Sequence, residues 1–548
     1  MSKLIIIGID GATPDLMFGW MEQGRLPNFQ KIKENGVIGE LETVPNQRSA
    51  AAWSSFVTGV NPGRHGIFEF YERIPLSHDI RFTKTTFRDG ISFWQYLSEN
   101  GKTVIVVNVP MTYPAEAVRG CLISGLDAPG KNSPGFTWPA DLLDRIERET
   151  GPYIQEPGVI SMVVNGQTGN AAARIVESVR QRGKAVRYLM EQYDWDNLVA
   201  VFRETDPAQH CFWEHMDRPG SGLEDAVFNV YRQIDEEVGE ILAAAGDDCR
   251  VLVMSDHGFG FRQHGSGCLN QWLEQAGFLT FKKKGGGSLF SGTMRFGYQA
   301  LEKMLSRRIK ERLFSLVPGL INKVQSRVFF SAIDWDRTIA YSDNVMPVIW
   351  INTADLSPNG VRPDRYEAVV ADIKRRLMEN CLEVDGRNPV VEWVRHRDEC
   401  YNGPRTARAP DLLIRWKGAE KISGLRYGRD GQPIFPLYPT REFMVNTGDH
   451  RPRGVFMAQG KGIEKNRTID GLDIVDVTAA AVYLNGLAVP EYMEGKIDPR
   501  MFEAAFFKDH PVKTGGRPFS KEATDEMDYS NEEETALKDR LRGLGYLE

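Results

Sequence analysis

The chain opens with MSKLIIIGIDGATPD, residues 1–15, and this stretch decides the fold. Residues 4–9 form a short apolar run that is rich in isoleucine and does not alternate with polar residues. Such a run is typical of a strand buried on both faces of a parallel sheet. It is too short for a signal-peptide core or for a membrane span, which needs roughly 18 apolar residues. Asp10 follows it directly, at the carboxyl end of the predicted strand, where active-site residues of α/β proteins usually lie.

Runs of the same kind recur at residues 103–107, 198–202 and 251–254. Helical patterns separate them, over residues 171–193 and 223–245 for example. Strand and helix in alternation predict an α/β fold, with a central, mostly parallel sheet flanked by helices on both faces.

A length of 548 residues is more than one compact core needs, so insertions are expected. Residues 282–332 begin with three lysines and three glycines and continue as a basic helical pattern, which predicts an inserted helical cap. The cap would divide a core into residues 1–281 and 333–505, and residues 506–548 would be a tail with a short helix. We interpret the cap as a solvated surface packed on the protein, and peripheral membrane contact through its basic residues as the less favoured alternative. Strand-like runs return after the cap, at residues 339–341, 348–351, 412–414 and 455–458.

The composition excludes some partners. A net charge of -7 argues against duplex nucleic acid, whose binding proteins are usually basic. A small anionic substrate remains compatible, because bound metal ions supply local positive charge. The six cysteines form no CxxC pair, which indicates reduced thiols. We therefore expect a cytoplasmic protein without a transmembrane segment.

Six acidic and histidine side chains are candidate metal ligands because most of them follow a predicted strand. They are Asp10, Asp206, His210, Asp256, His257 and His450. Asp206 and His210 are spaced so that one helical turn presents both on the same face. His450 lies in the glycine-flanked segment NTGDHRPRG. Carboxylate and imidazole ligands without thiolates suit an open catalytic site for zinc or manganese.

Ser49 is the candidate nucleophile, in the segment QRSAAAWSSFVTGVNPGRHG. It precedes a helix-compatible run that ends at Gly59, so its hydroxyl lies where backbone N–H groups point at an anion. Serine needs an activator, and with no base nearby in sequence a metal ion is the natural one. Alternatively Ser49 only caps the helix, and the two roles are compatible.

In this order, the segments GIDG, TGVNPGRHGIF, ETDPAQH, SDHGFG and GDHRPRG resemble those of the type I phosphodiesterases and nucleotide pyrophosphatases, a branch of the alkaline phosphatase superfamily. The resemblance covers most of the chain and implies an alkaline-phosphatase-like fold. It implies that one divalent ion is held by Asp10, Asp256 and His257 and also contacts Ser49. The second ion would be held by the remaining three ligands, with zinc favoured over manganese.

The resemblance further implies that Ser49 attacks phosphorus in a small phosphate ester, through a covalent phosphoseryl-type intermediate. Members commonly have threonine as nucleophile, and often an asparagine shortly after HGI that binds a phosphate oxygen; here Phe70 stands at that position. The substrate is therefore open. Asn108, in NVPMTYP, is a candidate polar contact with substrate, or else a turn residue at a strand end.

Three alternatives stay open beside a phosphodiesterase or nucleotide pyrophosphatase. They are a phosphomonoesterase, a phosphotransferase similar to the cofactor-independent phosphoglycerate mutases, and a metal-binding scaffold without turnover. A sulfatase is disfavoured, because Ser49 is followed by Ala-Ala-Ala-Trp and not by the proline and arginine of the formylglycine motif.

Overall fold

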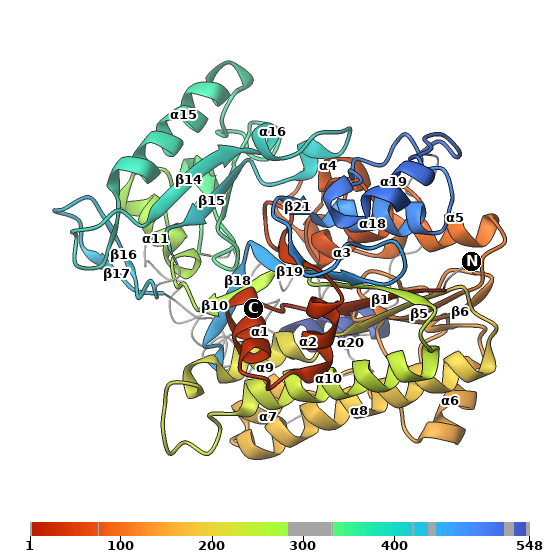
Figure 1. Cartoon of the computed structure of the whole chain (residues 1–548). Coiled ribbons are helices and arrows are strands. Elements are labelled where there is room, and N and C mark those ends of the chain that lie inside the picture. Colours follow the sequence, from red (N-terminus) through yellow and green to blue (C-terminus); the bar gives the residue numbers. More distant parts are fainter. Residues whose placement is uncertain are drawn as a thin grey trace.

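A computed structural model describes residues 3–74, 76–282, 330, 332–418, 421–436, 445–519 and 531–543. The predicted cap lies outside these residues, apart from 282, 330 and 332. The predicted α/β architecture is confirmed, with a central sheet between two layers of helices and a smaller lobe at one side (Figure 1). None of the helices in the described ranges has the length and apolar character of a membrane span.

The central sheet has the strand order β20-β2-β19-β9-β1-β8-β5-β6-β7, with β21 beside β2. The four strands predicted first lie together and run parallel: β9 (Cys249–Met254), β1 (Lys3–Ile9), β8 (Asn197–Phe202) and β5 (Val104–Val109). The outer strands are β2 (Gly36–Glu42), β6 (Gly120–Ser124), β7 (Thr137–Trp138), β19 (Arg453–Gln459), β20 (Arg467–Thr468) and β21 (Leu472–Asp473). β19 runs antiparallel to β9 and β2, and β7 runs antiparallel to β6.

Strand β1 separates two hydrophobic cores. Ile5, Ile7 and Ile9 contribute to one core, together with helices α8 (Thr168–Gln192) and α10 (Ala226–Ala245). Leu4 and Ile6 contribute to the other, which includes side chains of α3 (Ser49–Thr58), α5 (Phe93–Glu99) and α18 (Ile474–Leu484). Burial on both sides explains why the isoleucine run does not alternate with polar residues.

Shorter helices complete this part of the protein. They are α1 (Pro14–Glu22), α2 (Pro27–Glu34), α4 (Pro62–His65), α6 (Leu142–Thr150), α7 (Val159–Val164), α9 (Thr205–Phe212), α19 (Ala504–Asp509) and α20 (Asn531–Gly543). Two short antiparallel pairs join them: β3 (Tyr71–Arg73) with β4 (Ile80–Phe82), and β10 (Gly258–Phe261) with β18 (Gly448–Arg451).

The smaller lobe has its own core, around helices α11 (Leu269–Gln275) and α15 (Pro363–Asn380), and it also contains the short helix α16 (Arg397–Cys400). Its strands are β11 (Ala340–Tyr341), β12 (Val348–Ile351), β13 (Cys381–Glu383), β14 (Val391–His396), β15 (Leu412–Trp416), β16 (Leu425–Tyr427) and β17 (Pro433–Ile434). They form two sheets, β11-β12-β15-β14 and β13-β16-β17. Of the strand runs predicted after the cap, only residues 455–458, in β19, join the central sheet.

Helix α3 lies against β1 because Gly8 has no side chain. A Cβ atom added at Gly8 would lie 2.5 Å from Cη2 of Trp53. Trp53 also donates its indole N–H to Asp10 Oδ2, at 3.3 Å. Since Trp53 lies about one turn after Ser49, this contact holds the helix that carries Ser49 against the strand that precedes Asp10.

The contact predicts an unequal cost for two glycine substitutions. Gly8→Ala should lower the free energy of unfolding by about 1–3 kcal/mol, because the buried indole has to move. Gly19→Ala is the matched control: it lies within α1 with nothing within 4 Å of the added Cβ, so it should be neutral or slightly stabilising. Urea unfolding of both variants measures the difference. Equal stability of the two would contradict the close approach of α3 to β1.

Candidate active site

Three buried carboxylates follow three neighbouring strands. β1 pairs with β8 through Ile9 and Phe202, and with β9 through Gly8 and Met254. Neighbouring strands lie only about 4.8 Å apart, so side chains that follow them at the same edge meet. The carboxylates are Asp10 after β1, Asp206 after β8 and Asp256 after β9, and each is at most 1% exposed.

The first cluster consists of Asp10, Asp256 and His257, whose ligand atoms lie within 4.8 Å of one another. His257 Nε2 is 3.6 Å from Asp10 Oδ1 and 3.3 Å from Asp256 Oδ2. Ser49 Oγ lies 3.1 Å from the same nitrogen. The structure thus brings the predicted nucleophile to the three ligands with which the sequence associates it.

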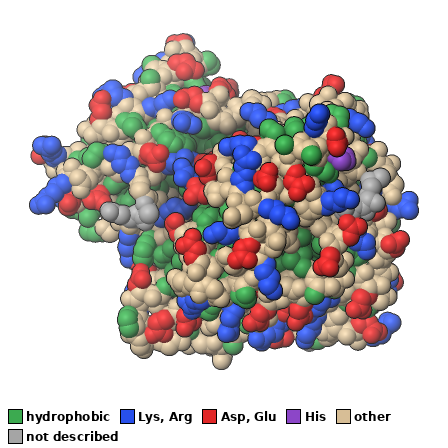
Figure 2. All heavy atoms as spheres, in the orientation of Figure 1, with side chains coloured by type: hydrophobic (Ala, Val, Ile, Leu, Met, Phe, Trp, Pro, Cys, Tyr) green, Lys and Arg blue, Asp and Glu red, His purple; other side chains and the backbone are tan. Residues whose placement is uncertain are grey.

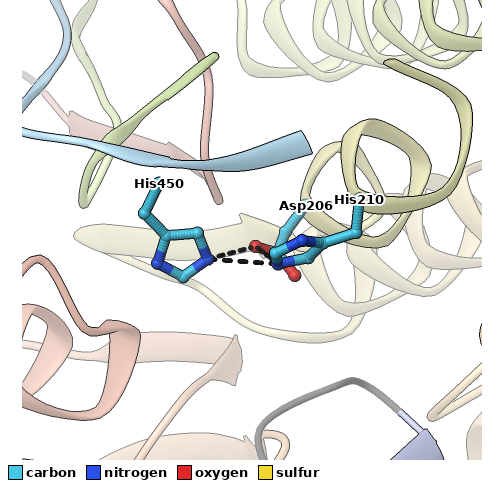
Figure 3. A group of neighbouring side chains, drawn as sticks. All are labelled: Asp206, His210 and His450. Atoms are coloured by element: carbon cyan, nitrogen blue, oxygen red, sulfur yellow. Dashed lines mark hydrogen bonds and ion pairs between the residues drawn. The ribbon is translucent and has the colours of Figure 1, made fainter. Parts of the chain in front are cut away.

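The second cluster consists of Asp206, His210 and His450, again within 4.8 Å of one another. Asp206 and His210 come from helix α9, and His450 reaches them from strand β18 (Figure 3). Asp206 Oδ2 is 3.4 Å from His210 Nε2 and 3.2 Å from His450 Nε2. The two Nε2 atoms are 3.2 Å apart.

Backbone carbonyl groups fix the tautomer of all three histidines. Each Nδ1 lies 2.8–3.0 Å from a carbonyl oxygen: His210 from Gly448, His257 from Gly258 and His450 from Gln47. A carbonyl oxygen only accepts hydrogen bonds, so each Nδ1 carries the proton. Each Nε2 therefore turns a lone pair toward its cluster, as in histidines that bind metal ions.

Acceptor atoms thus face one another in both clusters, an arrangement that a cation, either a metal ion or a proton, stabilises. The cation is not a proton on His450 at neutral pH, because burial lowers the pKa of this imidazole to about 4. In the first cluster, the buried Asp10 Oδ1 has no hydrogen-bond donor among the described residues. Three carboxylate or imidazole ligands per cluster, without thiolate, fit a divalent ion in an open site.

The pKa values of the acidic ligands show that ionised carboxylates are unfavourable in these clusters when no cation is bound. Burial, together with the charges of Asp256 and Asp206, raises the pKa of Asp10 well above its ordinary value. Burial likewise raises the pKa of Asp256 to about 7. A divalent ion would favour the ionised carboxylates that burial disfavours.

The turn before helix α3 contacts both clusters. The helix begins at Ser49, and Arg48 occupies the cap position, so the alternative that Ser49 is only a cap does not hold. Gln47 has a positive φ of 52°, unusual for a residue with a side chain, and its carbonyl oxygen accepts from His450 Nδ1. This single turn therefore places Ser49 at the first cluster and Gln47 behind a ligand of the second.

Some residues at the site were not predicted, and one predicted residue, Asn108, forms its side-chain hydrogen bond with a neighbouring strand and not with a ligand of either cluster. Gln47, Trp53 and Arg203 were not identified from the sequence. Arg203 could have been found, because it directly follows a predicted strand, as several predicted ligands do. Its Nε lies 3.9 Å from Asp10 Oδ2. Asn108 is buried with a positive φ of 61°, and its Nδ2 donates to Val201 O on the adjacent strand, at 3.0 Å. A contact of Asn108 with substrate stays a prediction.

The fold, with its central, mostly parallel sheet between helices, is alkaline-phosphatase-like. The sequence model of one family, "Type I phosphodiesterase / nucleotide pyrophosphatase", matches residues 4–418. The chain belongs to this family, and the predicted resemblance is confirmed. Membership makes it a phosphoric ester hydrolase of a superfamily that uses divalent metal ions.

One solved structure supports the fold, and a second superposes less closely. Phosphonoacetate hydrolase from Sinorhizobium meliloti 1021, in complex with phosphonoformate, superposes with a TM-score of 0.51 at 13% identity, over 88% of this chain and 95% of that chain. Murine ectonucleotide pyrophosphatase/phosphodiesterase 5 gives a TM-score of 0.45 at 12% identity, over 93% of this chain and 99% of that chain. No curated protein matches by sequence.

The raised pKa of Asp256, about 7, predicts how metal binding depends on pH. Without metal, the folded protein keeps this proton up to about pH 7 while the unfolded chain loses it near pH 4, so stability falls as the pH rises through that window. A bound divalent ion replaces the proton. The rise in Tm caused by Mn²⁺ or Zn²⁺, relative to EDTA, should therefore grow from pH 5 to pH 7. The apparent affinity should gain about tenfold per pH unit.

Asp235 provides the control for this measurement. It is a buried aspartate of α10 that accepts hydrogen bonds from Asn28 and Phe29, and burial raises its pKa too. Asp235→Asn should keep the pH dependence of the metal effect, and Asp256→Asn should lose it. A metal effect on Tm that is the same at pH 5 and pH 7 in the wild type would contradict a metal-linked Asp256.

Proposed function

We propose that the protein hydrolyses small phosphodiesters or pyrophosphates, with Ser49 as nucleophile and two divalent metal ions. The observation that carries the proposal is the set of six buried ligands, whose acceptor atoms converge in two clusters with Ser49 Oγ beside the first. Family membership supports the type of reaction. The cytoplasmic location stays a prediction.

Each cluster would hold one ion. Asp10, Asp256 and His257 would hold the ion next to Ser49, and the second would be held by Asp206, His210 and His450. Such ions favour the ionised serine oxygen and neutralise charge that develops on the phosphoryl oxygens. We favour zinc over manganese, because imidazole nitrogen and carboxylate oxygen in three-ligand sites are typical of catalytic zinc.

Ser49 is held where a nucleophile is needed. It is fully buried, begins the ten-residue helix α3, and is fixed in place by the contact of Trp53 with β1. The first N–H groups of α3 would favour a phosphoryl anion bound at this end of the helix. Ser49 Oγ forms a bond to phosphorus while the bond from phosphorus to the leaving oxygen breaks. Water then hydrolyses the phosphoseryl-type ester and regenerates the serine.

His257 offers a second way to activate Ser49, as a general base through its Nε2 at 3.1 Å. Burial lowers the pKa of His257 to about 4, which makes it a weak base at neutral pH. Its Nε2 also faces Asp10 and Asp256, an arrangement that suits a shared ion. Both observations favour activation of Ser49 by a metal ion.

Hydrolysis of model substrates tests the proposal. The metal-loaded protein should cleave bis-p-nitrophenyl phosphate with a higher kcat/KM than p-nitrophenyl phosphate. The reverse order would favour the phosphomonoesterase alternative, and transfer of the phosphoryl group to an added alcohol would favour the phosphotransferase. If neither compound is cleaved although metal is shown to be bound, the result would favour the alternative of a metal-binding scaffold without turnover.

The nucleophile assignment predicts a specific variant phenotype. Ser49→Ala should keep two metal ions per chain, because six ligands remain, and should lose kcat by about 10³-fold or more. Ser54→Ala is the matched control: Ser54 is a buried serine of the same helix whose hydroxyl has no hydrogen-bond partner among the described residues. It should keep near wild-type turnover. Wild-type turnover in Ser49→Ala would eliminate Ser49 as nucleophile.

A further inference from the structure

A pocket lies between the central part of the protein and the smaller lobe. Most of its wall is apolar or aromatic. One side comes from strands β3 and β4 and the segment before β3, and the other from β11, β12 and their connecting loop: Phe68, Tyr71, Ile80, Tyr341, Met346 and Trp350. Figure 2 shows hydrophobic side chains in the hollow between the two parts of the molecule.

The pocket wall includes residues that are close to the proposed nucleophile in sequence or through a contact. Asn46 lines the pocket and lies three residues before Ser49, so their Cα atoms are at most about 11 Å apart. Glu69 also lines it and forms a buried ion pair with Arg48, the residue directly before Ser49. A ring attached to a phosphoryl group at Ser49 would extend toward this part of the protein.

The charged side chains of the pocket wall already have partners within the protein. The pairs are Arg48–Glu69, Arg81–Glu72, Arg408–Glu72, Arg73–Tyr341 and Tyr71–Asp343. The last of these, at 2.8 Å, joins β3 to the smaller lobe. Glu69, Glu72 and Arg408 are thus in ion pairs, and Arg73 and Asp343 are hydrogen-bonded to tyrosine hydroxyls. These polar groups of the wall are therefore engaged within the protein, and the remaining wall is apolar and aromatic.

The aromatic side chains are held in a fixed arrangement. The rings of Tyr341 and Trp350 are stacked, with centroids 5.9 Å apart and planes at 20°. Tyr341 is packed edge-on against Trp335, with centroids 5.0 Å apart. Preorganised aromatic walls favour a flat ring, which they can contact by offset or edge-to-face packing without ordering new side chains.

We propose that this pocket binds an uncharged aromatic ester group of the substrate, so that the preferred substrates are aryl phosphodiesters. The inference rests on the proposed function, because it takes Ser49 as the position of the phosphoryl group. A nucleoside fits the pocket less well: the polar edge of its base and its sugar hydroxyls would replace water contacts with an apolar wall.

Binding to the metal-loaded protein tests the pocket without requiring turnover. Isothermal titration calorimetry compares phenylphosphonate, methylphosphonate and thymidine 5′-monophosphate. Phenylphosphonate should bind about 10- to 100-fold more tightly than methylphosphonate, as expected for burial of one ring. It should also bind more tightly than the nucleotide. A phenyl-to-methyl ratio near one would overturn the proposal, and so would tighter binding of the nucleotide.

Variants locate the effect in the pocket. Trp350→Ala should bring the phenyl-to-methyl ratio close to one and leave the affinity for methylphosphonate unchanged. Trp393→Ala is the matched control, a half-buried tryptophan of β14 in the same lobe that does not line the pocket, and should keep the wild-type ratio. If Trp350→Ala does not fold, Ile80→Trp tests the same point by filling the pocket from β4. An unchanged ratio in a folded pocket variant would overturn the assignment.

Turnover of bis-p-nitrophenyl phosphate, measured on the same samples, separates the two proposals. Turnover together with a phenyl-to-methyl affinity ratio near one would support the proposed hydrolase and contradict the proposed aromatic binding site. A high phenyl-to-methyl affinity ratio without turnover would support the aromatic binding site and contradict the proposed hydrolysis.

Discussion

Carboxylate oxygens and imidazole lone pairs face one another beyond the ends of β9, β1 and β8, and bound cations would relieve their mutual repulsion. Backbone carbonyls enforce this arrangement by keeping a proton on Nδ1 of all three histidines. Other features position the groups around it. The pairing of β10 with β18 brings His450 to helix α9, and Gly8 allows α3 to place Ser49 beside the first cluster.

The parts of the fold that depend on local pattern were predictable. The central strands are buried on both faces, so their sequences are continuously apolar, and ligands could be sought where each run ends. Contacts between segments far apart in sequence were not predictable. The hydrogen bond from His450 to Gln47 spans 403 residues, and nothing near Gln47 indicates it. In the sequence, Trp53 is indistinguishable from an ordinary core residue, and only the structure shows its close contact with Gly8.

Family membership indicates the type of reaction but not the substrate. The ligands lie at the ends of the central strands, whereas the pocket is lined by residues of β3, β4 and the smaller lobe, together with Asn46, Phe68 and Glu69. Loops and added lobes of this kind vary the substrate on a constant fold. Phe70, which stands where family members often have a phosphate-binding asparagine, is buried next to Tyr71 of the pocket wall. The same short segment thus departs from the family pattern and contributes to the proposed aromatic site.

The central claim is that both clusters bind metal ions. Crystals grown with Zn²⁺ and measured on both sides of the zinc absorption edge would test it most directly. We predict two anomalous peaks per chain, one bounded by Asp10, Asp256 and His257 and the other by Asp206, His210 and His450. An anomalous map without a peak at either cluster, from crystals that contain zinc, would contradict it.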